Sequence, residues 1–218
     1  MHMTSSQYIF LRHGKLVLPY RDHGDMPFQV LSDLGTFALN PPIDSDYAQK
    51  RIEQLRNDPR LKEISAIYTS PAVRCLDTAQ TLARQLGISA APQLESNLME
   101  VAFDLEKMDQ DGHVQTGLQK HGIAAVNTAV FEGMLSGSCE PISEVYKRVE
   151  TMFAHLRPVS GTLVCITHDF IMRVIEIYIR RQGAPYIPVT LGELEATRRN
   201  AYLSGFSTDA SLSNFLEI

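Results

Sequence analysis

Two stretches of the sequence decide the fold: residues 7–14 read QYIFLRHG, and residues 162–169 read TLVCITHD. Each begins as an apolar run with the length of one buried strand, and each run ends close to a histidine. A third run of the same kind, residues 64–71, reads ISAIYTSP and ends at Ser70-Pro71. Such runs, separated by helical patterns, predict β/α units wound into a mostly parallel sheet.

Apolar residues at helical spacing predict four helices, over residues 45–56, 71–86, 142–156 and 170–181. In the second of these, Ser70 is suited to the N-cap and Pro71 to the first helical position, and Gly87 is expected to end it. The tail from Asn200 to Ile218 alternates apolar and polar residues, which predicts a closing β-hairpin.

The composition is that of an ordinary globular protein. The chain has 218 residues, of which 44% are hydrophobic and 21% charged, so we expect residues 1–218 to form a single domain. Residues 112–138 are Gly-rich and irregular in pattern, and we expect an insertion of about residues 101–140 that covers the site. The predicted architecture is a three-layer α/β/α fold with a mostly parallel central sheet.

Charge and cysteine content narrow the classes of partner. The formal net charge of −5 argues against a nucleic-acid footprint or an anionic membrane surface, but it permits a small basic pocket. Cys75, Cys139 and Cys165 are odd in number and lack a CxxC spacing, which is typical of thiols in a reducing cytoplasm. Residues 1–6 do not resemble a signal peptide, and the apolar run 170–179 is too short to span a bilayer. The sequence therefore predicts a cytoplasmic protein, and it leaves the oligomeric state open, a dimer included.

Cationic side chains follow the predicted strands. In open α/β sheets, ligands bind beyond the carboxyl ends of the strands. We therefore expect these side chains on one rim of the sheet: Arg12, His13, Arg74 and His168. The planar guanidinium of arginine matches phosphate oxygens, and a neutral imidazole offers a ring nitrogen as nucleophile. These residue types point to the binding and transfer of a phosphoryl group.

Four segments, in this order along the chain, resemble the histidine phosphatase (phosphoglycerate mutase-like) superfamily. Residues 11–14 are similar to its Arg-His-Gly signature, and residues 70–79 to its Ser-Pro-x-x-Arg-x-x-x-Thr-Ala element. Residues 98–103 resemble its Leu-x-Glu-x-x-Phe segment, and Thr167-His168 resembles the strand end that carries its second histidine. The resemblance covers most of the chain and implies the fold of the phosphoglycerate mutase-like proteins.

The resemblance also implies a role for each residue of the rim. His13 would attack phosphorus and form a phosphohistidine, while Arg12, Arg74 and His168 would hold the phosphoryl oxygens. Glu100 would be the general acid for the leaving group and then the base for water. No metal or other cofactor is implied, since the arginines supply the positive charge.

The segments after Gly14 and after Glu100 depart from relatives in this family. Many relatives follow Arg-His-Gly with Glu-Thr and an Asn that contacts phosphate, whereas residues 15–20 read KLVLPY. Lys15, Arg21 and His23 are candidates to bind substrate in its place. The glycolytic mutases carry an Arg-His-Tyr-Gly-type continuation after the acid, whereas residues 101–104 read VAFD, which argues against that activity.

Local contacts of the site residues can also be predicted. His13 needs an unprotonated attacking nitrogen, and the carbonyl of Gly14 is the expected partner of its other ring nitrogen. Asp169 stands where the family often has Gly, and we expect its carboxylate to cap the helix that begins at Phe170.

The sequence thus predicts a metal-independent phosphomonoester hydrolase that acts on a small phosphorylated substrate. Asp104 and Glu106 are rivals to Glu100 as the proton donor. The alternatives are a phosphomutase or sugar-bisphosphate phosphatase of the same family, and a phosphate-binding module with impaired catalysis. A metallohydrolase that uses Asp22, His23 and Asp25 is a further alternative.

Overall fold

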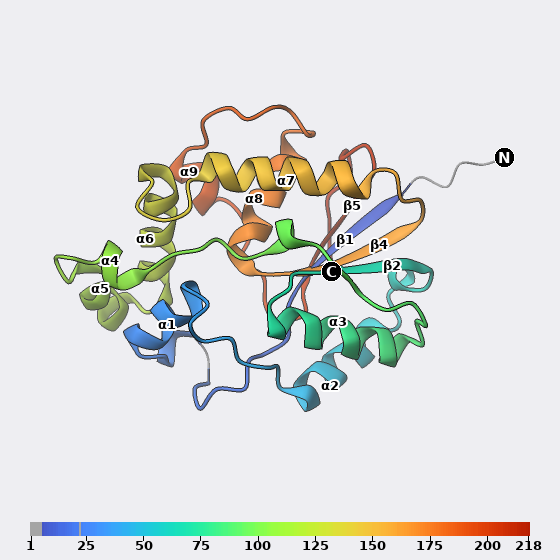
Figure 1. The fold of residues 1–218 in the computed structure, drawn as a ribbon, viewed down its shortest axis with the longest axis horizontal. Coiled ribbons are helices and arrows are strands. Elements are labelled where there is room, and N and C mark those ends of the chain that lie inside the picture. Colours follow the sequence, from blue (N-terminus) through green and yellow to red (C-terminus); the bar gives the residue numbers. More distant parts are fainter. Residues whose placement is uncertain (1–5, 22) are drawn as a thin grey trace.

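A six-stranded sheet forms the centre of the computed structural model, which describes residues 6–21 and 23–218 (Figure 1). The predictions that rest on residues 1–5 and on Asp22 lie outside the described residues. The sheet has the order β3-β2-β4-β1-β5-β6. Its strands are β1 (Gln7–Arg12), β2 (Ile64–Thr69), β3 (Gln93–Leu94), β4 (Thr162–Thr167), β5 (Gly205–Asp209) and β6 (Leu216–Glu217).

The register of the parallel strands explains why the two histidine segments meet. Strand β4 pairs in parallel with both β1 and β2, and Arg12 lies opposite Thr167. Because the last residues of β1 and β4 are aligned, His13 and His168 leave the sheet side by side at its carboxyl edge. Strands β5 and β6 add an antiparallel hairpin beside β1, so the predicted mostly parallel sheet and closing hairpin are both confirmed.

Helices cover both faces of the sheet, as Figure 1 shows. The helices are α1 (Phe28–Gly35), α2 (Ser45–Leu55), α3 (Val73–Leu86), α4 (Leu105–Met108), α5 (His113–His121), α6 (Ile123–Ser136), α7 (Ile142–Leu156), α8 (Asp169–Arg180) and α9 (Leu191–Glu195). Short 3-10 turns lie at His23–Asp25, Pro59–Leu61 and Ser96–Leu98.

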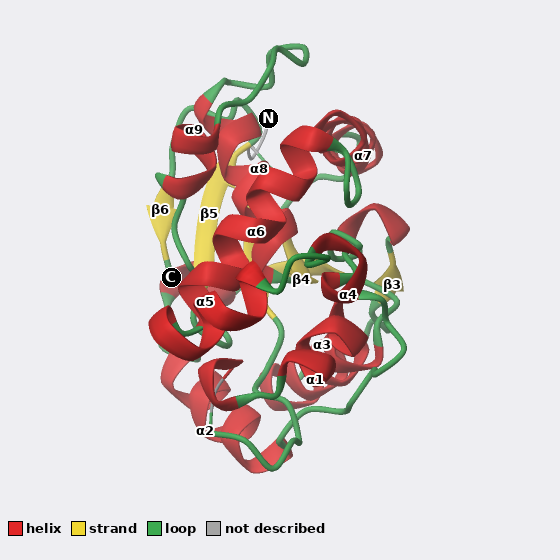
Figure 2. Ribbon diagram, turned by 90° about the vertical axis from the view of Figure 1, so that its left-hand side faces the viewer, coloured by secondary structure: helices red, strands yellow, loops and turns green. Residues whose placement is uncertain are grey.

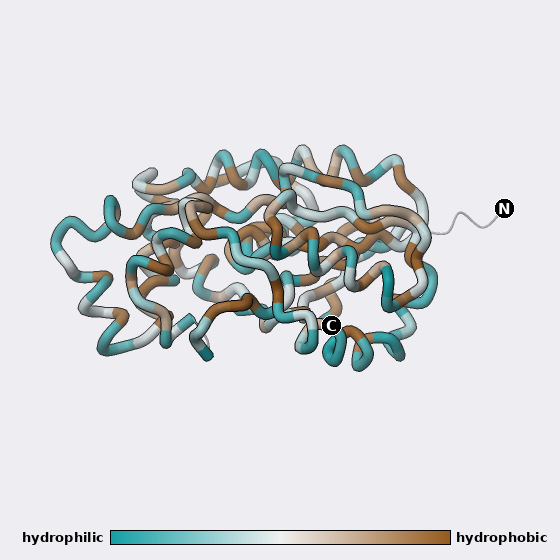
Figure 3. The backbone as a smooth tube through the Cα atoms, turned by 60° about the horizontal axis from the view of Figure 1, so that its bottom comes forward, coloured by the Kyte–Doolittle hydropathy of each residue, from teal (hydrophilic) through white to brown (hydrophobic). Residues whose placement is uncertain are grey.

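Alternation along β1 divides the core between the two faces. Tyr8 and Phe10 pack into the cluster that contains the buried residues of α7 and α8. Ile9 and Leu11 point the other way, into the cluster formed with α2 and α3. This is the α/β/α layering expected from period-two alternation in a sheet buried on both sides. Figure 3 shows hydrophobic segments mostly in the middle of the molecule and hydrophilic ones mostly at its edges.

Helix α3 begins later than the sequence predicts. Ala72 occupies the N-cap position and makes no side-chain cap, so the prediction of Ser70 as N-cap was wrong. The hydroxyl of Ser70 lies 2.9 Å from Nε2 of His168, and it accepts a weaker bond from the backbone N–H of Ala72. Gly87 ends the helix in the left-handed conformation, as predicted.

The prediction of irregular structure over residues 112–138 was also wrong, because helices α5 and α6 occupy this range. Gly122 and Gly137 have φ of 64° and 82° and lie at the ends of these helices, where a residue without Cβ is favoured. These two glycines therefore end the helices, while Gly117 and Gly133 lie within them. Figures 1 and 2 place α1 and α4–α6 beyond the carboxyl ends of the parallel strands.

Within the part of the chain that the structure describes, each helix is too short or too polar to cross a membrane.

Candidate active site

A pocket lies at the carboxyl edge of the sheet and is lined by both polar and apolar side chains. Its polar lining residues are Arg12, His13, His23, Arg74, Glu100, Asn127, Asp169 and Arg199. Its apolar lining residues are Leu16, Leu31, Leu34, Phe103, Ile123, Val126 and Phe170. Segments from both ends of the chain therefore build one site.

His13 is held in the pocket with one ring nitrogen engaged. Its Nδ1 lies 2.8 Å from the carbonyl oxygen of Gly14, as predicted. A carbonyl only accepts, so Nδ1 carries the proton, and in the neutral ring Nε2 has a free lone pair. Burial and the neighbouring charge of Arg74 set the pKa of His13 well below its ordinary value. The imidazole is therefore neutral at pH 7 and can act as a nucleophile at Nε2.

Arg12 is fixed on one side and open on the other. Its Nη1 donates to the carbonyl of Asn200 at 2.7 Å, and its guanidinium carbon lies 4.6 Å from the ring centroid of Tyr202. Its Nε is buried and has no hydrogen-bond acceptor among the described residues. The guanidinium thus lines the pocket with donor capacity left for an anion.

Arg74 reaches the same pocket from the first turn of α3. Its Nε donates to Nδ1 of His168 at 3.2 Å, and its Nη1 donates to the side chain of Asn40 at 3.4 Å. One turn further along α3, the Thr78 hydroxyl donates to the backbone carbonyl of Arg74 at 2.6 Å and accepts from the Gly14 N–H at 2.9 Å, which ties the helix to the His13 loop. Both arginines therefore lie around His13 on separate elements.

His168 lies behind the pocket wall. It is fully buried, and its ring centroid is 5.3 Å from that of His13. Because Nδ1 accepts from Arg74, the neutral ring carries its proton on Nε2 and donates it to the hydroxyl of Ser70 at 2.9 Å. Burial, together with Arg74, holds the pKa of His168 well below its ordinary value. In this structure both ring nitrogens are engaged, and His168 contacts the pocket through Arg74.

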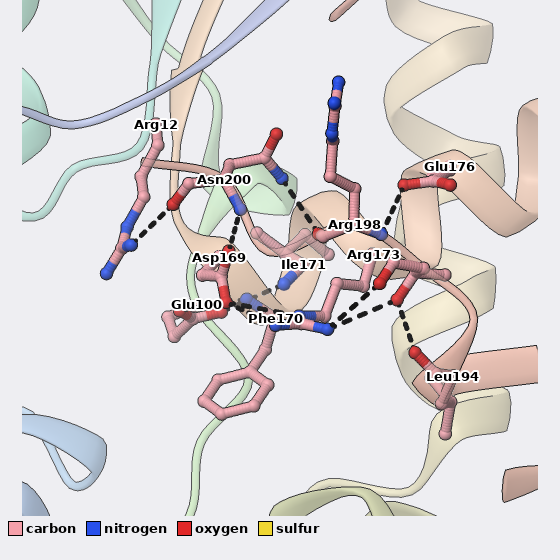
Figure 4. Close-up of polar contacts among 11 residues, drawn as sticks. Arg12, Glu100, Asp169, Phe170, Ile171, Arg173, Glu176, Leu194, Arg198 and Asn200 are labelled. Carbon is pink, nitrogen blue, oxygen red and sulfur yellow. Dashed lines mark hydrogen bonds and ion pairs between the residues drawn. The ribbon is translucent and has the colours of Figure 1, made fainter. Parts of the chain in front are cut away.

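Glu100 caps helix α8 from outside the helix. Its Oε1 accepts from the backbone N–H of Ile171 at 3.0 Å, and its Oε2 accepts from that of Phe170 at 3.3 Å (Figure 4). Oε1 also accepts from the backbone N–H of Val101 at 3.0 Å. The prediction that Asp169 caps this helix was therefore wrong. The carboxylate of Asp169 turns away to Arg173.

Burial raises the pKa of Glu100 above its ordinary value, and the nearby Asp169 acts in the same direction. The N–H groups of Ile171 and Val101 act against this, because they stabilise the ionised form. The net direction is upward, which suits a carboxyl group that must carry a proton to a leaving group. The rivals lie elsewhere: Asp104 caps α4, and neither it nor Glu106 lines the pocket.

The three candidates for substrate binding separate in space. His23 lines the pocket and stacks on Tyr202, with ring centroids 5.8 Å apart. Arg21 is exposed and pairs with Asp25, while Lys15 lines a shallow depression beside α2. The structure therefore brings only His23 of the three to the pocket.

Sequence reasoning missed two polar residues of the pocket, Asn127 and Arg199. Asn127 lies on α6, in the range for which irregular structure was predicted. Arg199 belongs to a basic pair, Arg198-Arg199, ahead of the predicted hairpin, and that pair was the available signal.

In chemical terms the pocket places the neutral imidazole of His13 with the guanidinium groups of Arg12 and Arg74 and the buried carboxyl group of Glu100, whose pKa is raised. Such a set can bind a tetrahedral anion, attack it at its centre and protonate the group that leaves.

Comparison with known proteins agrees with this description. The family model of the histidine phosphatase superfamily (branch 1) matches residues 42–187, a range that includes Arg74, Glu100 and His168 but not His13. Since the match spans more than half of the sequence, the chain belongs to the histidine phosphatase superfamily. A comparison with curated proteins gave no match.

Solved structures with the same fold include phosphatases and a mutase. A phosphoglycerate mutase from Bacillus anthracis is 14% identical with a TM-score of 0.60, over 100% of this chain and 95% of that one. A mycobacterial glucosyl-3-phosphoglycerate phosphatase is 15% identical with a TM-score of 0.60, over 97% and 95%. A variant phosphoserine phosphatase from Entamoeba histolytica, in complex with phosphoserine, is 14% identical with a TM-score of 0.56, over 97% and 96%. At such identities the likeness establishes the fold, and the predicted α/β class and family are confirmed.

Proposed function

We propose that this protein is a phosphomonoester hydrolase that forms a phosphohistidine on His13 and needs no metal ion. The observation that carries the proposal is the state of His13: Nδ1 is held by a carbonyl, and the pKa of the ring is lowered by burial and two flanking arginines. A nitrogen lone pair is thereby available between two guanidinium groups that neutralise a phosphoryl group.

In the first half of the proposed reaction, Nε2 of His13 attacks phosphorus in line. The N–P bond forms as the bond from phosphorus to the ester oxygen breaks. Glu100 gives its proton to that oxygen, so an alcohol leaves. Arg12 and Arg74 bind the equatorial oxygens, where charge is spread in the transition state.

In the second half, water attacks phosphorus and the N–P bond breaks. The carboxylate of Glu100 takes the proton from water, which restores the acid, and phosphate leaves with the electron pair returned to Nε2 of His13. His168 acts in both halves as the neutral partner that orients Arg74.

The walls of the pocket suggest the class of ester. The phosphoryl end meets the arginines, whereas the leaving group faces apolar side chains from α1 and α6, among them Leu31, Leu34 and Val126. We propose a small phosphomonoester whose leaving group has an apolar surface. Cytoplasmic location stays a prediction from the sequence.

The test is hydrolysis of a panel of phosphomonoesters by wild type, His13→Ala and the matched control His121→Ala, with chelator present throughout. His121 is an exposed histidine at the end of α5, outside the pocket. We expect His13→Ala to lose activity by about a thousandfold or more, since it removes the nucleophile. The control should retain full activity. Undiminished hydrolysis by His13→Ala, or loss of wild-type activity in chelator, refutes the proposal. Tight phosphate binding without turnover on the whole panel favours an impaired phosphate-binding module.

A further inference from the structure

Helix α8 carries charged side chains along one buried stripe. Asp169, Arg173 and Glu176 follow one another at spacings of four and three residues, so they share a face of the helix. Each is at most 7% exposed. Buried charges are costly unless they are paired, so their partners indicate what this stripe does.

Glu176 pairs with Arg180 on α8 itself, and the other partners outside the stripe lie on the segment 197–200, between α9 and β5. Figure 4 shows the contacts with this segment. Asp169 accepts from the backbone N–H of Asn200 at 2.9 Å, and Glu176 accepts from that of Arg198 at 3.1 Å. Arg173 connects the helix with the segment: it donates to Asp169 on α8 at 3.0 Å and to the carbonyl of Thr197 at 3.4 Å. One face of α8 therefore binds the segment at Thr197, Arg198 and Asn200.

The held segment in turn holds Arg12. The carbonyl of Asn200 accepts from Nη1 of Arg12 at 2.7 Å, and this carbonyl belongs to the residue whose N–H is bound by Asp169. A continuous path of hydrogen bonds thus runs from Asp169 through the backbone of Asn200 to the guanidinium that lines the pocket.

We propose that Asp169 is a positioning residue: through Asn200 it fixes the Arg12 guanidinium in the geometry that binds a phosphoryl group. The inference rests on the proposed function and explains why an acid is tolerated in the wall of an anion pocket. Its carboxylate is occupied by Arg173 and by the N–H of Asn200, so it serves the binding of an anion while being negative itself.

Charge and positioning make opposite predictions for Asp169→Asn. Removal of a negative charge beside the pocket, taken alone, strengthens the binding of phosphate. Loss of the ion pair to Arg173 leaves Asn200 and Arg12 less firmly held, which weakens the binding of phosphate. Whether the affinity for phosphate rises or falls in Asp169→Asn therefore distinguishes the effect of charge from the effect of positioning.

The experiment is a double-mutant cycle read out as the dissociation constant of inorganic phosphate, measured by calorimetry at pH 7. The proteins are wild type, Asp169→Asn, Arg12→Ala and the double variant. Glu193→Gln serves as the control, because it breaks an ion pair with Arg181 away from the pocket. We expect Asp169→Asn to weaken phosphate binding about tenfold in the wild-type background, with little change in the Arg12→Ala background, since coupled residues are not additive.

Equal weakening in both backgrounds indicates general loosening and overturns the proposal, as does tighter binding in both. If Asp169→Asn does not fold, Glu176→Gln loosens the same segment at Arg198 and is expected to show the same dependence on Arg12. If Arg12→Ala binds phosphate as tightly as wild type, the pocket is not the phosphate site, and the proposed function is refuted as well. Binding that depends on Arg12 but not on Asp169 refutes this inference alone.

Discussion

Glu100→Gln should separate the two halves of the proposed reaction. An aryl phosphate releases a stabilised phenolate, which needs no proton, whereas an alkyl phosphate releases an alkoxide, which does. In the variant we expect the phosphorylation of His13 by an aryl phosphate to be nearly unchanged and that by an alkyl phosphate to fall by about 10²–10⁴, the usual contribution of general acid catalysis. Attack by water should slow with both esters, because it needs the base.

The contacts of Glu100 determine how much stability Glu100→Gln loses. The amide oxygen of glutamine can replace Oε1, which accepts the N–H groups of Val101 and Ile171. The amide nitrogen then faces the N–H of Phe170, whose bond to Oε2 is the longest of the three at 3.3 Å. One buried donor loses its acceptor, which costs about 1–3 kcal/mol. A domain stable by about 5–15 kcal/mol stays folded.

The assay is rapid mixing of an excess of aryl phosphate with Glu100→Gln, followed by the absorbance of the released phenol. We expect a burst of about one phenol per active site and then a slow steady state, because the phosphohistidine accumulates. Quenching in base should trap the acid-labile phosphoenzyme for mass spectrometry. His13→Ala is the control and should show no burst.

A first turnover that slows equally for aryl and alkyl esters refutes the assignment of Glu100 as the proton donor. A steady state that is unchanged from wild type refutes its role as the base.

Two further predictions concern the fold. Because the pKa values of His13 and His168 are lowered in the folded state, the unfolded chain binds protons that the folded chain does not. The raised pKa of Glu100 acts in the opposite direction, so the measurement uses Glu100→Gln, which has no carboxyl group to titrate at this position. In that variant the two histidines should lower the free energy of unfolding by up to about 1.5 kcal/mol from pH 7.5 to pH 6 in urea titrations, and a rise contradicts their lowered pKa values. Gly205→Ala should destabilise the protein by about 3 kcal/mol or more, since its Cβ would lie 1.8 Å from the carbonyl oxygen of Phe10 on β1. Thermal unfolding close to that of wild type would contradict the close pairing of β5 with β1.

The scaffold could be predicted from the sequence because its signals are local. Strands β2 and β4 and helix α7 lie at the predicted residues, since apolar runs and helical spacing act over a few neighbouring positions. The meeting of His13 with His168 also followed, because parallel strands present their carboxyl ends at one edge. Helices α5 and α6 were missed because the glycines of this range were interpreted as loop signals, although Gly112, Gly122 and Gly137 stand at helix ends and the other two lie within the helices.

By itself, the sequence determined which residue types stand at the strand ends, and hence the family and the proposed nucleophile. Only the tertiary structure decided which carboxylate accepts hydrogen bonds from which donors. Both Glu100 and Asp169 can cap α8, but Arg173 and Asn200 occupy Asp169, so Glu100 takes the free N–H groups. The physical reason is competition: a polar group bonds to whichever donor or acceptor the packing brings within about 3 Å, and that choice depends on residues far away in sequence.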